Sequence, residues 1–257
     1  MLVPVIENRN QTATSGRRGK RLDWLVRLTV IPLLVLAGIW FVTGMPGRSW
    51  SGSVPPLTDK EQRIQDNLKR HVEELAGRIG ERNVWRPEAM AAAAGYIRMT
   101  LEEAGYVVNV QPFTSRGQTV ANIEAILPGR AAADEIIVIG AHYDSVAGCP
   151  GANDNASGVA TLLELARLLA GTTMPRSVRF VAFANEEAPF FYGDEMGSNR
   201  YAARAQARGE RIEAMLSLET VGYYTDRPDS QFYPFPFSLF YPSTGNFIGF
   251  VGNLSSR

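Results

Sequence analysis

The sequence predicts an α/β fold in which helices flank a doubly wound, mostly parallel β-sheet. Segments of strand length alternate along the chain with segments of helical periodicity, an order typical of parallel α/β sheets. One strand segment, 135–140 (EIIVIG), is almost entirely apolar, as expected of a strand that is buried on both faces. The 257 residues, of which 45% are hydrophobic, are enough to enclose one core of this kind with extensions.

Basic residues and an apolar segment distinguish the N-terminus from the rest of the chain. Its excess of positive charge comes from Arg9, Arg17, Arg18, Lys20, Arg21 and Arg27. Segment 24–44 (WLVRLTVIPLLVLAGIWFVTG) approaches the roughly 20 apolar residues that cross a bilayer, and Trp24 and Trp40 suit its two interfaces. We therefore expect a basic cytoplasmic N-terminus at 1–23, a single transmembrane anchor at 24–44, and an extracytoplasmic remainder.

A cleaved signal peptide and a buried core helix are the other interpretations of segment 24–44. No small-residue cleavage signal follows it, since the sequence there reads MPGRSW, and the basic region before it is long for a signal peptide. These features favour an uncleaved anchor.

The charges of the whole chain balance, with 26 Lys and Arg against 26 Asp and Glu. Because no net positive charge is present, a nucleic acid is not expected as a partner. Cys149 is the only cysteine, so an internal disulfide is excluded.

A linker rich in Gly, Pro and Ser, residues 45–58, leads to a soluble domain that we expect at 59–257. The domain begins with a segment, 59–80, whose apolar residues recur at steps of three and four, as one face of a helix requires. A second helix is expected from Pro87, in its first turn, to Ala104, where Gly105 ends it. Beyond it, the expected strands are 106–113, 119–127, 135–140, 177–184 and 215–220, and the expected helices are 159–171 and 198–209.

Polar residues follow three of these strands, where the sites of parallel sheets lie. They are His142 and Asp144 after 135–140, Glu186 and Glu187 after 177–184, and Glu219 in 215–220, with Asp154 just before helix 159–171. Each alone has an ordinary structural interpretation, and Asp154 in particular could cap the helix. Three strand ends that bring acids and a histidine to one edge of the sheet together predict a hydrolytic metal site.

Imidazole and carboxylate ligands without a set of thiolates favour zinc or a similar ion. Cys149 is a weak candidate ligand. Gathered carboxylates repel one another unless cations lie among them, and two ions about 3.5–4 Å apart can share a carboxylate and activate a water. A further acid must then accept the proton of that water.

The segments HYDS, GANDNASGVATLLELAR, NEE, DEMGS and SLETVGYY together resemble the co-catalytic zinc aminopeptidase family, metallopeptidase family twenty-eight. The resemblance extends from about His71 to the end of the chain. It implies a zinc-exopeptidase-like (phosphorylase/hydrolase-like) fold for 59–257, peptide substrates, and removal of their N-terminal residues.

The resemblance also assigns roles to individual residues. It implies that His142 and Glu219 bind one zinc, Asp154 bridges two, Glu187 binds the other, Glu186 is the general base, and Asp144 orients the imidazole of His142. Glu219 stands where many members have Asp. A cis peptide bond is expected between Asp154 and Asn155.

One ligand of the family is missing. Its second zinc also binds a histidine near the C-terminus, whereas this chain has only His71, interpreted as a surface or packing residue, and His142. We therefore expect a chain truncated at its C-terminus, with two Zn²⁺ in the complete protein. A glutaminyl-cyclase-like acyl transferase and an inactive, peptidase-like binding domain are the alternatives. The aromatic segments 188–198 and 231–247 are expected to border the substrate cleft or to pack in the core or a lid.

Overall fold

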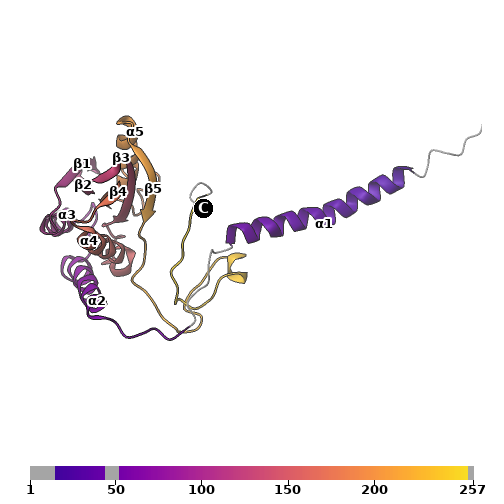
Figure 1. Cartoon of the computed structure of the whole chain (residues 1–257), viewed down its shortest axis with the longest axis horizontal. Helices are drawn as coiled ribbons and strands as arrows, with labels where there is room; N and C mark the ends of the chain where they lie inside the picture. The colour runs from indigo at the N-terminus through magenta and orange to yellow at the C-terminus, as the bar shows by residue number, and fades with distance from the viewer. Residues whose placement is uncertain (1–14, 44–51, 254–257) are drawn as a thin grey trace, which may run out of the picture. The chain divides into compact units, whose positions relative to one another are not determined.

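The computed structural model describes residues 15–43 and 52–253, so the predicted segments 1–23 and 45–58 lie partly outside the described residues. The chain divides into two compact units (Figure 1). One comprises Met1–Pro55 and Tyr233–Tyr241, and the other comprises Pro56–Phe232 and Pro242–Arg257.

The first unit contains helix α1 (Ser15–Thr43) and a single 3₁₀ turn, η3 (Phe237–Leu239). Helix α1 exposes large apolar side chains, namely Trp24, Val26, Leu28, Val30, Ile31, Leu33, Leu34, Val35, Leu36, Trp40 and Phe41. In the two described ranges, no helix has the length and apolar character of a membrane span. The transmembrane anchor expected at 24–44 stays a prediction.

The second unit is built on a five-stranded sheet with the order β1-β2-β4-β3-β5. The strands are β1 (Val108–Ser115), β2 (Gln118–Leu127), β3 (Gly129–His142), β4 (Met174–Phe183) and β5 (Arg211–Ser217). Strand β3 pairs in parallel with β4 and β5, whereas β2 pairs antiparallel with β1 and β4. The expected α/β class is confirmed, but the sheet is mixed rather than mostly parallel.

The turn between β1 and β2 explains this difference. Ser115 pairs with Gln118, so only Arg116 and Gly117 connect the strands, and both have positive φ angles, of 48° and 78°. Two consecutive residues with positive φ make the tight turn that suits the twist of an antiparallel hairpin. The sequence analysis identified the two strands but not the turn that makes them antiparallel.

The helices begin and end close to the expected residues. Helix α2 (Asp59–Val72) starts with a capping box between Thr58 and Glu61 and continues as a π-helix, η1 (Glu73–Ile79). Helix α3 (Pro87–Glu103) has proline in its first turn. Helices α4 (Gly158–Leu169) and α5 (Gly197–Ala207) follow β3 and β4 respectively.

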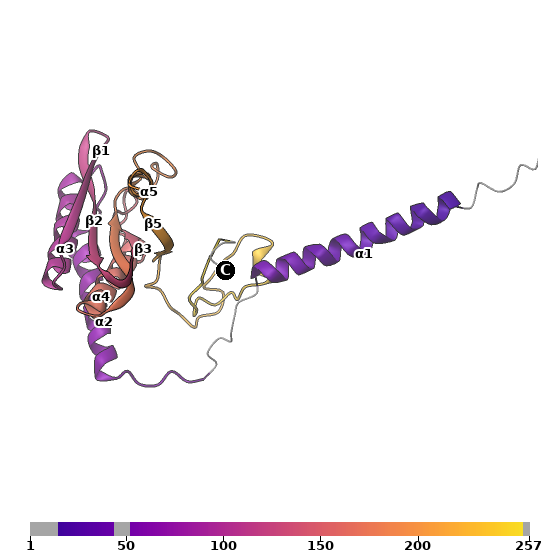
Figure 2. The ribbon, with the colours of Figure 1, turned by 45° about the horizontal axis from the view of Figure 1, so that its top comes forward.

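Apolar clusters lie on both faces of the sheet. The larger joins α3 and α4 to the sheet, and Figure 2 shows α3 beside β1 and β2. Its central members include Ile97, Leu162, Leu163, Phe180 and Val178. A smaller cluster on the opposite face contains Tyr201 of α5 and Phe183 of β4, whose rings meet edge to face. Helices thus cover both faces, as a doubly wound sheet requires.

Strand β5 differs from the prediction in position and in burial. It spans Arg211–Ser217 instead of 215–220, and all seven of its residues are exposed. It is an edge strand, paired only with β3 among the described strands. Glu219 consequently lies two residues beyond the strand.

His71, on α2, lies in the interior beside Tyr96 of α3. Its side chain is 2% exposed, and its Nδ1 lies 2.6 Å from the hydroxyl of Tyr96. Burial, assisted by the positive charge of Arg70, lowers the pKa of His71 to about 4. His71 is therefore a neutral packing residue at physiological pH.

Protonation of His71 should weaken the fold in acid. Since its pKa falls from about 6.5 in the unfolded chain to about 4 in the folded one, stability present above pH 6.5 is lost as the pH falls toward 4. His71→Gln can still hydrogen-bond Tyr96 but cannot titrate. Between pH 7 and 4.5, the free energy of unfolding from urea titrations should fall by roughly 2–3 kcal/mol more for the wild type than for His71→Gln. Equal losses in the two proteins would contradict this explanation.

Candidate metal centre and active site

The site lies where β3, β4 and β5 end. His142 is the last residue of β3, Glu186 and Glu187 follow β4, and Glu219 follows β5. Asp154 belongs to a short π-helical turn, η2 (Ala152–Ser157), that leads into α4. Five of the six predicted site residues, all except Asp144, line one open cleft of about 500 Å³.

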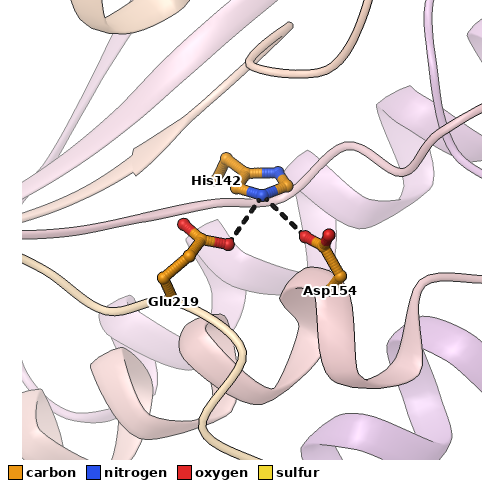
Figure 3. Close-up of side chains that lie close together, drawn as sticks. All are labelled: His142, Asp154 and Glu219. Carbon is orange, nitrogen blue, oxygen red and sulfur yellow. Dashed lines mark hydrogen bonds and ion pairs between the residues drawn. The ribbon is translucent and has the colours of Figure 1, made fainter. Parts of the chain in front are cut away.

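His142, Asp154 and Glu219 lie close enough to bind one ion (Figure 3). The Nε2 atom of His142 is 3.1 Å from Asp154 Oδ1 and 3.1 Å from Glu219 Oε1. All three ligand atoms lie within 4.8 Å of one another, and no other group of three such residues meets this limit in the described part of the chain. The turn before a helix, the end of a strand and a loop thus each bring one side chain to the same point.

This geometry fits zinc. Zinc–nitrogen and zinc–oxygen bonds of 2.0–2.2 Å place tetrahedral ligands about 3.3–3.6 Å apart, a little more than the 3.1 Å found here. The surroundings also demand a cation. Burial lowers the pKa of His142, but hydrogen bonds to Asp144 and Glu219 and the charges of these carboxylates outweigh it and raise the pKa to about 11.

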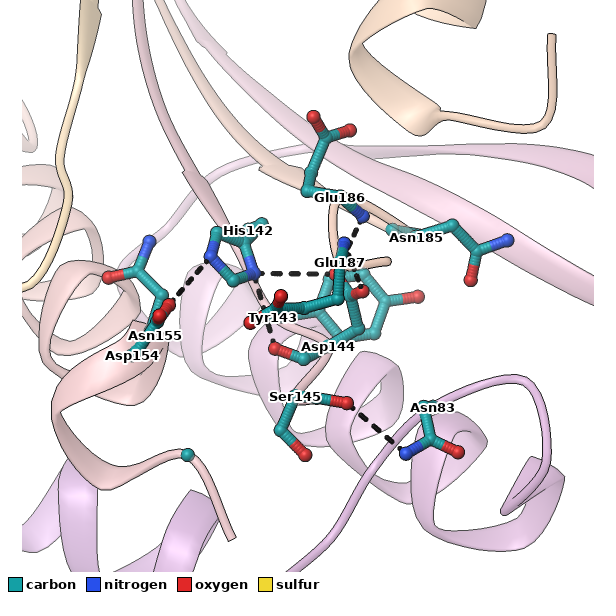
Figure 4. Close-up of polar contacts among 12 residues, drawn as sticks. Asn83, His142, Tyr143, Asp144, Ser145, Asp154, Asn155, Asn185, Glu186 and Glu187 are labelled. Atoms are coloured by element: carbon teal, nitrogen blue, oxygen red, sulfur yellow. Dashed lines mark hydrogen bonds and ion pairs between the residues drawn. The ribbon is translucent and has the colours of Figure 1, made fainter. Parts of the chain in front are cut away.

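Asp144 connects the ends of β3 and β4 from beneath the cleft (Figure 4). Its carboxylate is buried, with Oδ1 lying 3.4 Å from His142 Nδ1. The same carboxylate accepts the backbone N–H groups of Glu186 and Glu187, each at 3.1 Å. The position of Asp144 beside Nδ1 of His142 is compatible with its predicted orienting role, and its carboxylate also holds the backbone of the two glutamates, which the sequence did not predict.

Glu187 lines the cleft, but its carboxylate does not belong to the close group of three. Burial raises its pKa, and the negative charges of Asp154, Asp144 and Glu219 add to the effect. Glu187 is therefore near enough to the other acids to interact with them electrostatically. Two of the ligands expected for a second zinc, Asp154 and Glu187, thus line this cleft.

Glu186 points in another direction. Both of its carboxylate oxygens accept hydrogen bonds from Ser198, one from the backbone N–H at 2.6 Å and one from the hydroxyl at 2.7 Å. Figure 4 shows this carboxylate directed away from the imidazole of His142. Burial raises the pKa of Glu186, and the bonds from Ser198 oppose the rise.

Ser198, which no sequence pattern singled out, also lines the cleft. It is the second residue of α5, where backbone N–H groups lack partners within the helix and favour an anion. In the sequence, the feature that indicates this residue is a serine at the start of the expected helix 198–209, in the segment DEMGS.

The turn before α4 leaves Asp154 free for the site. The peptide bond from Asp154 to Asn155 is cis, as expected. Asn155 supplies the helix start, because its Oδ1 accepts the N–H of Gly158 at 3.0 Å, and its Nδ2 donates to the carbonyl of Leu218 at 2.9 Å. Asn155 thus does the capping that Asp154 might otherwise do, and it holds the residue before Glu219.

Comparisons with known proteins show which family and which relatives the chain resembles. A family model, peptidase family M28, matches residues 122–240. The uncharacterized protein YfbL of Escherichia coli is 36% identical over 234 residues, which are 88% of this chain and 67% of that protein. Aminopeptidase YwaD of Bacillus subtilis is 36% identical over 117 residues, 45% of this chain but 24% of YwaD. The chain thus spans two thirds of one relative and about a quarter of the other.

Solved structures show the same fold. The aminopeptidase from Aneurinibacillus sp. strain AM-1 aligns with a TM-score of 0.54 at 19% identity, over 64% of this chain and 72% of that one. A glutaminyl cyclase from an Acidobacteriales bacterium aligns with a TM-score of 0.52 at 19% identity, over 72% of this chain and 68% of that one. The fold is therefore shared by peptidases and cyclases.

Asp144→Asn should destabilise the protein without a change in size. The amide can accept only through its oxygen, so one of the N–H groups of Glu186 and Glu187 loses its buried acceptor, at a cost of about 1–3 kcal/mol. Urea unfolding of the full-length chain measures this loss. Asp134→Asn, which alters an exposed ion pair with Arg211, is the matched control and should leave the unfolding midpoint unchanged. Equal midpoints for the two variants would contradict the role of Asp144.

Proposed function

Because the chain belongs to peptidase family M28, we propose that it is a zinc-dependent metallopeptidase, and specifically an aminopeptidase that removes N-terminal residues from peptides. The observation that carries this proposal is that His142 Nε2 lies 3.1 Å from both Asp154 Oδ1 and Glu219 Oε1 in an open cleft. Zinc dependence has further support from relatives such as the probable zinc metalloprotease of Pyricularia oryzae.

We assign the predicted ligand roles to these residues. His142, Asp154 and Glu219 would hold one zinc, and Glu187, together with Asp154, would hold a second. Bound zinc supplies a Lewis acid for the scissile carbonyl and lowers the pKa of a coordinated water. Asp144 keeps the His142 ring oriented through its Nδ1 side.

Glu186 accepts the proton of the attacking water and returns it to the leaving amine. Its pKa is raised by burial, and a base whose pKa approaches the working pH transfers protons in both directions efficiently. For this step the carboxylate must turn from Ser198 toward the water, because its two oxygens are bonded to Ser198 in the present structure.

Apolar side chains suggest the substrate. Phe183, Phe191, Met196 and Met215 line the same cleft as the acids. Met215 and Phe191 are well exposed, so they are open to a ligand. We propose that these residues receive an apolar side chain at the N-terminus of a peptide.

Glu186→Gln should abolish hydrolysis while zinc content stays the same. Removal of a general base lowers the rate by about 100-fold to 10,000-fold, whereas the ligands remain in place. Release of N-terminal residues from peptides by the full-length chain, together with elemental analysis of zinc, measures both effects. Glu213→Gln, on the exposed face of β5, is the control and should keep full activity. A Glu186→Gln protein that retained most of its activity would rule out the assigned base.

The same assay separates the alternatives. A glutaminyl cyclase would convert an N-terminal glutaminyl peptide to its cyclised form without releasing a residue. An inactive binding domain would neither release nor cyclise, and a folded wild-type chain without zinc would favour that interpretation.

We also propose that the N-terminal segment holds the protein at a membrane, with residues 1–23 in the cytoplasm and the peptidase unit outside it. The apolar side chains that α1 exposes and the basic residues before them support this localisation. The full-length chain should sediment with membranes and resist carbonate extraction, and a chain without residues 1–44 should be released. Recovery of the full-length chain in the soluble fraction would refute this localisation.

A further inference from the structure

Arg82 is a fully buried arginine behind the candidate metal centre. It lies between η1 and α3, and its side chain is 0% exposed. In the described part of the chain, no carboxylate forms an ion pair with its guanidinium. Its donors instead reach backbone carbonyl oxygens, those of Tyr143 (2.6 Å), Leu75 (3.3 Å), Gly80 (3.1 Å), Pro150 (2.5 Å) and Gly151 (3.0 Å).

Three of these carbonyls belong to the two segments that carry candidate zinc ligands. Tyr143 directly follows His142. Pro150 and Gly151 immediately precede the turn that contains Asp154. One rigid, planar group therefore connects the end of β3 to the start of η2, and it does not line the cleft.

Ser145 reinforces the same connection. Its hydroxyl accepts the backbone N–H of Arg82 at 3.1 Å and donates to the carbonyl of Cys149 at 2.8 Å. The backbone N–H of Ser145 donates to the carbonyl of Arg82 at 2.8 Å. Arg82 and Ser145 thus act together on both segments.

The charge of Arg82 also bears on the site. Burial lowers its pKa to about 10, and the negative charges of Asp144 and Asp154 oppose this lowering. The guanidinium is therefore protonated at neutral pH. It is therefore a buried cation whose charge interacts with Asp144 and Asp154, two of the acids that repel one another.

We infer that Arg82 is a positioning residue of the metal centre, which holds His142 and Asp154 at the separation that zinc requires and offsets part of the acidic charge. This inference rests on the proposed zinc site. Lysine would keep the charge but not the planar fork of donors that reaches several carbonyls at once, so Arg82→Lys isolates the geometric contribution.

The test is zinc and cobalt binding by the full-length wild type, Arg82→Lys and Ser145→Ala. Zinc affinity is measured by competition with a chelator, and the visible absorption of bound Co²⁺ reports ligand geometry. Arg82→Lys should bind zinc at least about 10-fold more weakly, as is usual for residues that support metal ligands, and its Co²⁺ spectrum should change. Ser145→Ala should show a smaller effect in the same direction.

Arg179→Lys is the matched control. Arg179 is also largely buried, but it bonds Glu210 and Tyr201 instead of the backbone segments at the cleft. Its substitution should lower stability and leave zinc affinity and the Co²⁺ spectrum unchanged.

The outcomes distinguish this inference from the proposed function. If the wild type binds zinc and both variants match it in affinity and spectrum, even with lower stability, Arg82 is merely structural and the inference fails alone. If the wild type takes up no zinc, the proposed function fails and the inference with it. Should Arg82→Lys not fold, Ser145→Ala decides, because it keeps the guanidinium and loosens only the connection.

Discussion

Repulsion among acidic side chains is the constraint on which the site depends. Asp144, Asp154, Glu187 and Glu219 interact at one edge of the sheet. Burial raises the pKa of Glu187, and the charges of the other three acids add to the rise. The structure offsets this charge in three ways. His142 lies between two of the acids, backbone N–H groups bind Asp144, and the buried cation of Arg82 lies beneath them. A metal ion bound in the cleft, as proposed, would complete the compensation.

The parallel part of the sheet brings these groups together. Because β3 pairs in parallel with β4 and β5, their carboxyl ends meet at one edge, and each end delivers part of the site. The antiparallel hairpin of β1 and β2 extends the sheet on the other side and contributes no ligand to the cleft. The mixed sheet therefore still brings the carboxyl ends of three parallel strands to one edge, as the expected parallel sheet would.

Most elements of the second unit were predictable because their signals are local. The helical periodicity of 59–80, the proline that starts α3 and the apolar character of 135–140 each depend on neighbouring residues. His142, Glu186 and Glu187 were also placed correctly at the ends of β3 and β4. The errors lay at β5 and in the direction of β2, since both depend on which strand becomes the neighbour, and that choice involves residues far apart in the sequence.

The sequence by itself determined the elements, the residues at their ends and the kind of ion that they suit, because spacing and residue type are enough for each. Only the tertiary structure decided how these residues are held. The bonds from Ser198 to Glu186, from Glu186 to Asp144, and from Arg82 to Tyr143 join residues 12, 42 and 61 positions apart. No local pattern encodes such pairs, since they form only when the packed core brings the segments into hydrogen-bonding distance.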